Sequence, residues 1–170
     1  RLVQVAVSAG PPGKRALRIS SRDATRSDST WTVHARGFLA PRRSDDRAAA
    51  APPELVAARP ANEHYAAAAQ RGLEYGPAFQ GIVQLQRDGH GATARLALPE
   101  GLTGTGHTLH PALLDAALQL GVALIDRGSP DDTFVPVRIE AVAAVRRGTL
   151  TAGWARATLR AAAPQSSTVI

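Results

Sequence analysis

The sequence predicts an α+β fold in which antiparallel strands surround one central apolar helix. Short segments of alternating or β-branched residues predict strands, and residues 111–126 predict a helix that has no polar face. Strand and helix patterns do not alternate regularly, as a parallel α/β sheet would require. With 170 residues, of which 44% are hydrophobic, the chain is long enough for one ordinary domain.

The first part of the chain predicts three antiparallel strands, at residues 2–7, 16–20 and 31–39. Residues 10–14 (G-P-P-G-K) resemble a phosphate-binding loop only in composition, because the two prolines lack the backbone N–H donors that a phosphate needs. We expect a hairpin turn there. Residues 40–60 are rich in Ala, Pro and charge without a clear period, which predicts a linker over the surface.

A short helix and a second group of strands follow the linker. The helix is expected from residue 63 to about residue 71, with Asn62 as its N-terminal cap and Gly72 as its stop. The remaining strands are predicted at residues 82–86, 92–98, 134–145 and 153–161. The turn pair Asp88-Gly89 predicts that the first two of these strands form a hairpin.

The predicted helix over residues 111–126 (P-A-L-L-D-A-A-L-Q-L-G-V-A-L-I-D) carries one carboxylate, Asp115, and one amide, Gln119, in its middle. A helix without a polar face belongs inside a protein, where a charge is costly unless it is paired or used. Positions four apart share one face, so the Gln119 amide can donate to the Asp115 carboxylate and orient it. Two interpretations stay open: a catalytic carboxylate, or a polar pair that only satisfies itself.

Composition excludes several classes of function. The absence of cysteine excludes a disulfide framework and a thiolate nucleophile, and it suits a reducing interior. No apolar run approaches the length of a membrane span, and no secretory signal opens the chain, so we expect a soluble, cytoplasmic protein without membrane contacts. The net charge of +6 comes with only 4% aromatic residues and scattered arginines, which disfavours nucleic-acid binding and favours an acidic protein partner.

Common catalytic motifs are missing from the sequence. There is no G-x-S-x-G, G-x-x-x-x-G-K-[ST], G-x-G-x-x-G or H-E-x-x-H pattern. His107, His110 and Asp115 are conceivable metal ligands, but their segment is loose and no second carboxylate is close in sequence. We therefore predict no metal site.

Two segments carry the most information about function. Residues 72–81 read G-L-E-Y-G-P-A-F-Q-G, and residues 110–119 read H-P-A-L-L-D-A-A-L-Q. In this order the two segments resemble the dehydratase domains of modular type I polyketide synthases, whose second half carries G-x-x-Y-G-P-x-F-Q-G and then H-P-x-x-L-D-x-x-x-Q. Residues 31–39 (W-T-V-H-A-R-G-F-L) are similar to the strand that closes the first half of such domains. Residues 134–137 (F-V-P-V) are similar to the family's L-P-F segment.

The resemblance implies a double hot-dog fold, in which each half wraps an antiparallel sheet around a long helix. Residues 1–42 would be the last strands of an incomplete first hot dog, residues 43–60 a linker, and residues 61–170 the second hot dog. By motif position, Asp115 would be the catalytic acid, with Gln119 and Tyr75 supporting it. The resemblance assigns the substrate pocket to Gly76, Pro77, Phe79, His110, Leu114 and Pro136. Val137 and Ile139 stand where the family often has Phe and Trp, which changes the expected pocket lining.

The resemblance also implies a reaction. The family removes water from a β-hydroxyacyl thioester carried on the phosphopantetheine arm of an acyl carrier protein, to give an α,β-unsaturated thioester. No cofactor is expected. The implied partners are the acyl carrier protein, neighbouring synthase domains and a second copy through a dimeric parent synthase.

One family motif is missing. The family's base is a histidine in H-x-x-x-G-x-x-x-x-P near the start of the first half, and none of the five histidines of this chain has that G and P. The simplest expectation is that the chain is an interior piece of a longer synthase, without the opening segment and the final strands. Two alternatives stay open: a related double-bond isomerase or pyran-forming cyclase using the same aspartate, and an inactive structural domain.

Overall fold

The computed structural model describes residues 1–26, 28–41, 54–89, 91–124, 137–140, 142 and 149–159. The chain divides into two compact units, Arg1–Ala48 and Ala49–Ile170. We describe each unit by itself.

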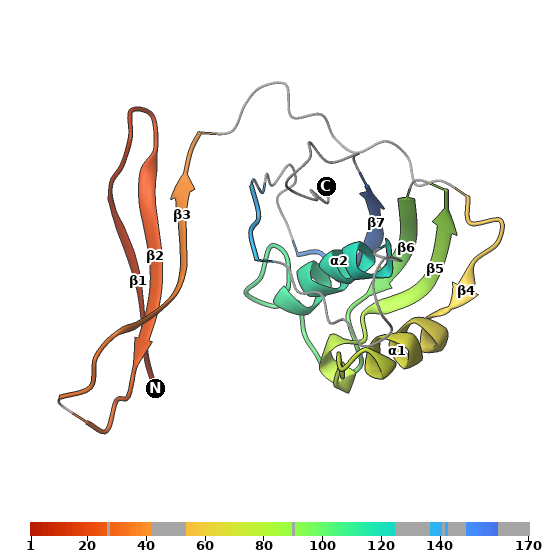
Figure 1. Cartoon of the computed structure of the whole chain (residues 1–170), viewed down its shortest axis with the longest axis horizontal. Helices are drawn as coiled ribbons and strands as arrows, with labels where there is room; N and C mark the ends of the chain where they lie inside the picture. The colour runs from red at the N-terminus through yellow and green to blue at the C-terminus, as the bar shows by residue number, and fades with distance from the viewer. Residues whose placement is uncertain are drawn as a thin grey trace. The chain divides into compact units, whose positions relative to one another are not determined.

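The first unit contains a three-stranded antiparallel sheet in the order β1-β2-β3 (Figure 1). Its strands are β1 (Leu2–Ala9), β2 (Arg15–Arg22) and β3 (Thr32–Leu39). The three predicted strands are confirmed, each within two residues at either end. The predicted hairpin turn is present as well, since the Lys14 N–H donates to the Pro11 carbonyl at 2.9 Å and Gly13 adopts a positive φ of 74°.

The second unit contains a four-stranded antiparallel sheet in the order β4-β5-β6-β7 (Figure 1). Its strands are β4 (Arg59–Pro60), β5 (Ile82–Asp88), β6 (Gly91–Ala97) and β7 (Ala152–Thr158). The predicted hairpin of β5 and β6 is confirmed. The last predicted strand, residues 153–161, is confirmed as β7, while its residues 160 and 161 lie outside the described residues. Asp88, expected in the turn, is instead the last residue of β5 and pairs with Gly91.

The start of the short helix differs from the prediction. Helix α1 (Ala61–Gln70) begins directly after Pro60, and Asn62 lies inside its first turn, where its side-chain oxygen accepts the Glu63 N–H at 3.0 Å. Asn62 is therefore not the cap. The physical reason is that residues 59 and 60, expected in the linker, form edge strand β4, where proline is tolerated and from which the chain enters the helix at once. Residues 42–53 of the predicted linker lie outside the described residues.

The end of helix α1 agrees with the prediction. Gly72 adopts φ 78°, and its N–H donates to the carbonyl of Ala69 at 3.0 Å. The N–H of Leu73 donates to the carbonyl of Ala68 at 3.0 Å. This pair of bonds is a Schellman motif, which satisfies carbonyls that the helix leaves without partners.

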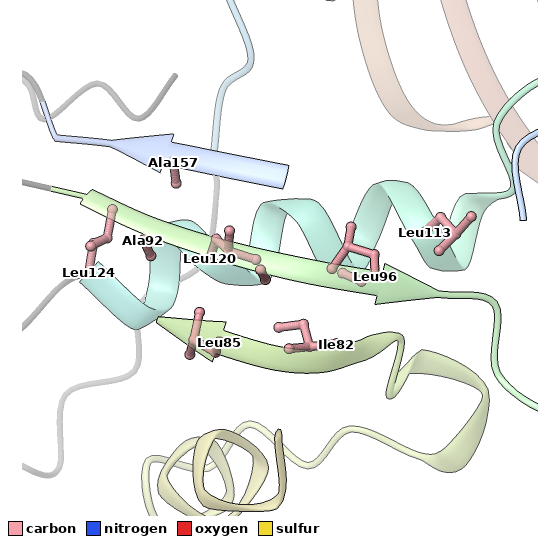
Figure 2. Packing of buried hydrophobic residues seen from close by; sticks show 10 residues of the cluster. Ile82, Leu85, Ala92, Leu96, Leu113, Leu120, Leu124 and Ala157 are labelled. Atoms are coloured by element: carbon pink, nitrogen blue, oxygen red, sulfur yellow. The ribbon is translucent and has the colours of Figure 1, made fainter. Parts of the chain in front are cut away.

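Helix α2 (Pro111–Leu124) is the centre of the second unit. It packs against β6 and β7, and no residue from Ala112 to Leu124 is exposed, as a helix without a polar face requires. Leu113 and Leu120 of α2 belong to one hydrophobic core with Ile82, Leu85 and other residues of the sheet (Figure 2). Residues 125 and 126, at the end of the predicted helix, lie outside the described residues.

One predicted strand, at residues 134–145, is absent from the part of that segment that the structure describes. Of residues 134–145, the structure describes residues 137–140 and 142, and none of these belongs to a strand. Val137 is 94% exposed. A β-branched residue favours a strand only when a neighbouring strand and a packed surface are available, so the local pattern was misleading here.

No helix among the described residues is both long and apolar enough to cross a bilayer.

Gly81 sets the distance between helix α2 and the sheet. A Cβ atom at this position would lie 3.1 Å from the Ala116 Cβ and 3.2 Å from the Ala97 carbonyl oxygen. The Gly81 carbonyl also accepts the Ala97 N–H at 2.9 Å. The helix can approach the sheet this closely only because residue 81 has no side chain.

We expect Gly81→Ala to lower the free energy of unfolding by about 1–3 kcal/mol, because the added methyl group must displace packed atoms. Gly76→Ala is the matched control, since Gly76 has an ordinary extended backbone and nothing within 4 Å of the added Cβ. Urea unfolding of the intact domain measures both. Equal stabilities of the two variants would contradict the packing argument.

Candidate active site

Asp115 and Gln119 form a hydrogen-bonded pair on helix α2. The Gln119 Nε2 donates to Asp115 Oδ2 at 2.7 Å. Gln119 is 2% exposed, whereas Asp115 is half-buried. The contact expected from the four-residue spacing is therefore present, with the carboxylate directed to the more accessible side of the pair.

The same amide reaches the other informative segment. Gln119 Nε2 donates a second hydrogen bond to the backbone carbonyl of Phe79 at 2.9 Å. Phe79 ends the 3-10 turn Pro77–Phe79. This turn is held by two bonds: the Phe79 N–H donates to the Gly76 carbonyl at 2.8 Å, and Gln80 Nε2 donates to the Tyr75 carbonyl at 2.8 Å. The two segments, some thirty residues apart in the sequence, thus meet at one side chain.

The orientation of the Gln119 amide follows from its partners. Both hydrogens of Nε2 have acceptors, the Asp115 carboxylate and the Phe79 carbonyl. The amide oxygen Oε1 is buried and accepts no hydrogen bond from the described residues. Reversing the amide would place its oxygen against two acceptors, so the donor arrangement is strongly preferred.

Two tyrosines, Tyr65 and Tyr75, lie near the pair of Asp115 and Gln119. Tyr65, on α1, accepts the Ile82 N–H at its hydroxyl oxygen at 2.9 Å, and its ring meets that of Tyr75 edge-on with centroids 6.0 Å apart. Burial first, and then the charges of Tyr75 and Asp115, raise the pKa of Tyr65 from 10.0 to about 12, against the opposing hydrogen bond from Ile82. Burial and the charge of Asp115 also raise the pKa of Tyr75. Both phenols therefore stay neutral at neutral pH.

His110 caps helix α2. Its Nδ1 accepts the Ala112 N–H at 3.1 Å, and its carbonyl accepts the N–H groups of Leu113 and Leu114. A neutral imidazole with Nδ1 as acceptor carries its hydrogen on Nε2. The His107 ring lies edge-on to the His110 ring at 4.9 Å. Within the described part of the chain, no three His, Cys, Asp or Glu side chains gather as a metal site would require.

The remaining predicted pocket residues are placed as follows. Gly76, Pro77 and Phe79 lie exposed in and beside the 3-10 turn, Leu114 is half-buried next to Asp115, and Pro136 lies outside the described residues. A groove of about 510 Å³ in this unit runs between α1, β5 and the end of α2, past His64 and Val122, and none of the predicted pocket residues lines it. The assignment of a substrate pocket to these residues stays a prediction.

Comparison with known proteins identifies the family. Residues 43–170 match the family described as polyketide synthase dehydratase N-terminal domain. The chain belongs to the polyketide synthase dehydratase family. The recognition made from the two segments is confirmed, while the division of the chain into first and second hot dogs stays a prediction.

This dehydratase-family chain matches a small part of several large synthase proteins. Spectinabilin polyketide synthase system protein NorA of Streptomyces orinoci is 36% identical over 98% of this chain, which spans only 9% of that protein. Mycoketide-CoA synthase of Mycobacterium tuberculosis is 33% identical over 98% of this chain, which spans 4% of it.

Solved structures of dehydratase domains share the fold. The dehydratase domain from the CurF module of curacin polyketide synthase has a TM-score of 0.78 and 30% identity, covering 98% of this chain and 61% of that one. The CurK dehydratase has a TM-score of 0.72 and 31% identity, and the match covers 93% of this chain and 56% of the CurK chain. Two of its structures are inactive mutants, one with histidine replaced by phenylalanine and one with aspartate replaced by asparagine. These similarities confirm the predicted double hot-dog fold. This dehydratase chain holds a part of that fold.

The sequence interpretation missed Tyr65. Nothing in its spacing links it to Asp115, because the residues lie on different helices and their relation depends on the tertiary packing. The available signal was that Tyr65 is the only large apolar side chain in an alanine-rich helix (A-N-E-H-Y-A-A-A-A-Q). Such a residue is expected to pack inward and to find a partner for its hydroxyl group.

Titration of the tyrosines tests this electrostatic environment. We expect both phenols to ionise above pH 10 and Tyr65 near pH 12, followed through the ultraviolet absorbance of phenolate. Tyr75→Phe leaves Tyr65 as the only tyrosine, so the remaining titration belongs to Tyr65. Its pKa should be lower than in the wild type, because the charge of Tyr75 is removed, and Asp115→Asn should lower the pKa of Tyr65 for the same reason. Because the folded pKa of Tyr65 lies above its unfolded value, stability should be complete below pH 10 and fall as the pH rises toward 12. Midpoints at the ordinary value would contradict the burial of these side chains.

Proposed function

We propose that this chain carries the aspartate side of a dehydratase that acts on a β-hydroxyacyl thioester held by an acyl carrier protein. One observation supports this most directly: Gln119 joins the Asp115 carboxylate to the Phe79 carbonyl, so the two segments that mark the family form one hydrogen-bonded site. The inactive aspartate-to-asparagine mutant of CurK dehydratase supports a catalytic carboxylate in this fold.

The proposed reaction is an elimination of water. Asp115 in its acid form donates a proton to the β-hydroxyl group as the bond between the β-carbon and oxygen breaks. A base removes the α-proton, and the electron pair of that C–H bond becomes the α,β double bond. Two groups of different acidity suffice for these steps, so we propose no cofactor.

The base is not among the motifs of this chain. None of its five histidines stands in H-x-x-x-G-x-x-x-x-P, and the chain spans 61% of the CurF dehydratase. We therefore assign the base to a histidine of the parent domain outside this chain. The inactive histidine-to-phenylalanine mutant of CurK supports a histidine base in this fold.

The partners follow from the chemistry and the charge. A substrate tethered as a thioester must arrive on a carrier, and the net charge of +6 favours docking of an acidic carrier protein. The chain spans 9% of NorA, a multidomain relative, which supports neighbouring synthase domains as further partners. We also propose a homodimer formed through the parent synthase.

Replacement of the proposed acid tests the function. In the intact parent domain, Asp115→Asn should lower the rate of dehydration of a β-hydroxyacyl thioester about 10²–10⁴-fold, because the proton donor is lost while an acceptor for Gln119 remains. Glu100→Gln, at an exposed position after β6, is the matched control that removes a carboxylate elsewhere and should leave the rate unchanged. An active Asp115→Asn variant would refute the assignment.

Analysis of the products of the same reaction separates the proposed elimination from related chemistry. Simple dehydration yields an α,β-unsaturated thioester lighter by one water. A shifted alkene or an oxygen heterocycle as the main product would instead identify an isomerase or a cyclase.

A further inference from the structure

Tyr65 contacts the chain on the far side of the segment that Gln119 holds. Its hydroxyl oxygen accepts the N–H of Ile82, the first residue of β5, at 2.9 Å. Gln119 binds the carbonyl of Phe79, three residues earlier, at 2.9 Å. The chain from Phe79 to Ile82 is therefore fixed at one end by a side chain from α1 and at the other by a side chain from α2.

The residues between these two bonds have little freedom to move. Gly81 packs closely against Ala116 of α2, since a Cβ at residue 81 would lie only 3.1 Å from the Ala116 Cβ, and its carbonyl is paired with the Ala97 N–H of β6. A displacement of Ile82 would therefore be passed to Phe79 and to the Gln119 amide. Gln119 also holds the Asp115 carboxylate at 2.7 Å, so the position of that carboxylate depends on the same chain.

Tyr65 also contacts a second residue of the site. Its ring packs edge-on against Tyr75, with centroids 6.0 Å apart and planes inclined by 67°. The His64 ring also meets the Tyr65 ring edge-on, with centroids 5.2 Å apart. The Tyr65 hydroxyl donates to no acceptor among the described residues, so its oxygen serves here as an acceptor for the backbone.

We propose that Tyr65 is a positioning residue for the elimination: its hydroxyl oxygen anchors Ile82, and through Phe79 and Gln119 this anchor sets the place of the Asp115 carboxylate. This inference rests on the proposed function. It assigns to Tyr65 no contact with the substrate and no proton transfer.

Tyr65→Phe in the intact parent domain is the test, because it keeps the ring and its packing and removes only the hydroxyl group. We expect kcat for dehydration to fall about tenfold, with KM unchanged, since misplacing a catalytic group by about 1 Å costs on the order of 100-fold. The side-chain amide signals of Gln119 in NMR spectra should shift, and the Ile82 amide should lose protection against hydrogen exchange.

Ala66→Gly is the matched control. Ala66 is the exposed neighbour of Tyr65 in α1, and glycine weakens a helix interior while leaving the Tyr65 hydroxyl in place. We expect this variant to lower the thermal midpoint and to leave kcat and the Gln119 signals unchanged. An unchanged kcat in Tyr65→Phe, or an equal loss of kcat in Ala66→Gly, would overturn the inference.

Failure of the proposed function can be distinguished from failure of the positioning role of Tyr65. If the wild-type parent domain dehydrates no β-hydroxyacyl thioester, the proposed function fails, and the spectra alone decide the positioning role. Shifted Gln119 signals in Tyr65→Phe would then still support the anchor, and unchanged signals would refute it.

Discussion

The arrangement of the site depends on one buried amide. Gln119 donates both hydrogens of Nε2, one to the Asp115 carboxylate on its own helix and one to the Phe79 carbonyl on the segment before β5. A buried amide is costly unless it is hydrogen-bonded, and each satisfied bond to a charged group contributes more than a neutral one. Gln119 therefore links two parts of the fold and defines a single orientation for the carboxylate.

This interaction explains why an apolar helix tolerates polar residues at its centre. The rest of α2 buries leucine and alanine side chains against β5, β6 and β7, and that packing holds the helix in place. The polar pair lies on the side that meets the turn Pro77–Phe79, where a backbone carbonyl is available. The polar pair therefore does more than satisfy itself, because Gln119 also binds outside its own helix, and the catalytic role of Asp115 stays a prediction.

The sequence predicted the elements whose signals are local. The apolar run of residues 111–126 placed α2, and the four-residue spacing brought Asp115 and Gln119 to one face. Alternating and β-branched segments placed six of the seven described strands, all except β4. The contacts of Gln119 with Phe79 and of Tyr65 with Ile82 were not predictable in this way, since they join residues 40 and 17 positions apart. They depend on how α1 and α2 pack on the sheet, which no pattern within a single segment records.

The two errors have the same origin. Asn62 has the side chain of a good cap, but the start of α1 is set by the pairing of Arg59 and Pro60 with β5, which moves the helix forward. Residues 137–140 include β-branched residues, but local preference does not supply a neighbouring strand. In each case a tertiary contact, or its absence among the described residues, decided between conformations that the local sequence allows.

The place of Asp115 depends finally on where α2 begins. The connection from β6 to α2 is held by the residues that precede β7: the Leu98 N–H donates to the Thr151 carbonyl at 2.7 Å, and Leu109 forms a bridge with Leu150. His110 then caps the helix through its side chain and its carbonyl, so the first turn has a defined start. A helix fixed at its first residue places every later side chain at a known rotation, since each residue turns the helix by a constant angle. Gln119 thus reaches the carbonyl of Phe79, and Asp115 lies one helical turn before it, on a helix whose start is held by the residues that precede β7. The local sequence around the carboxylate only has to supply the acid and its amide.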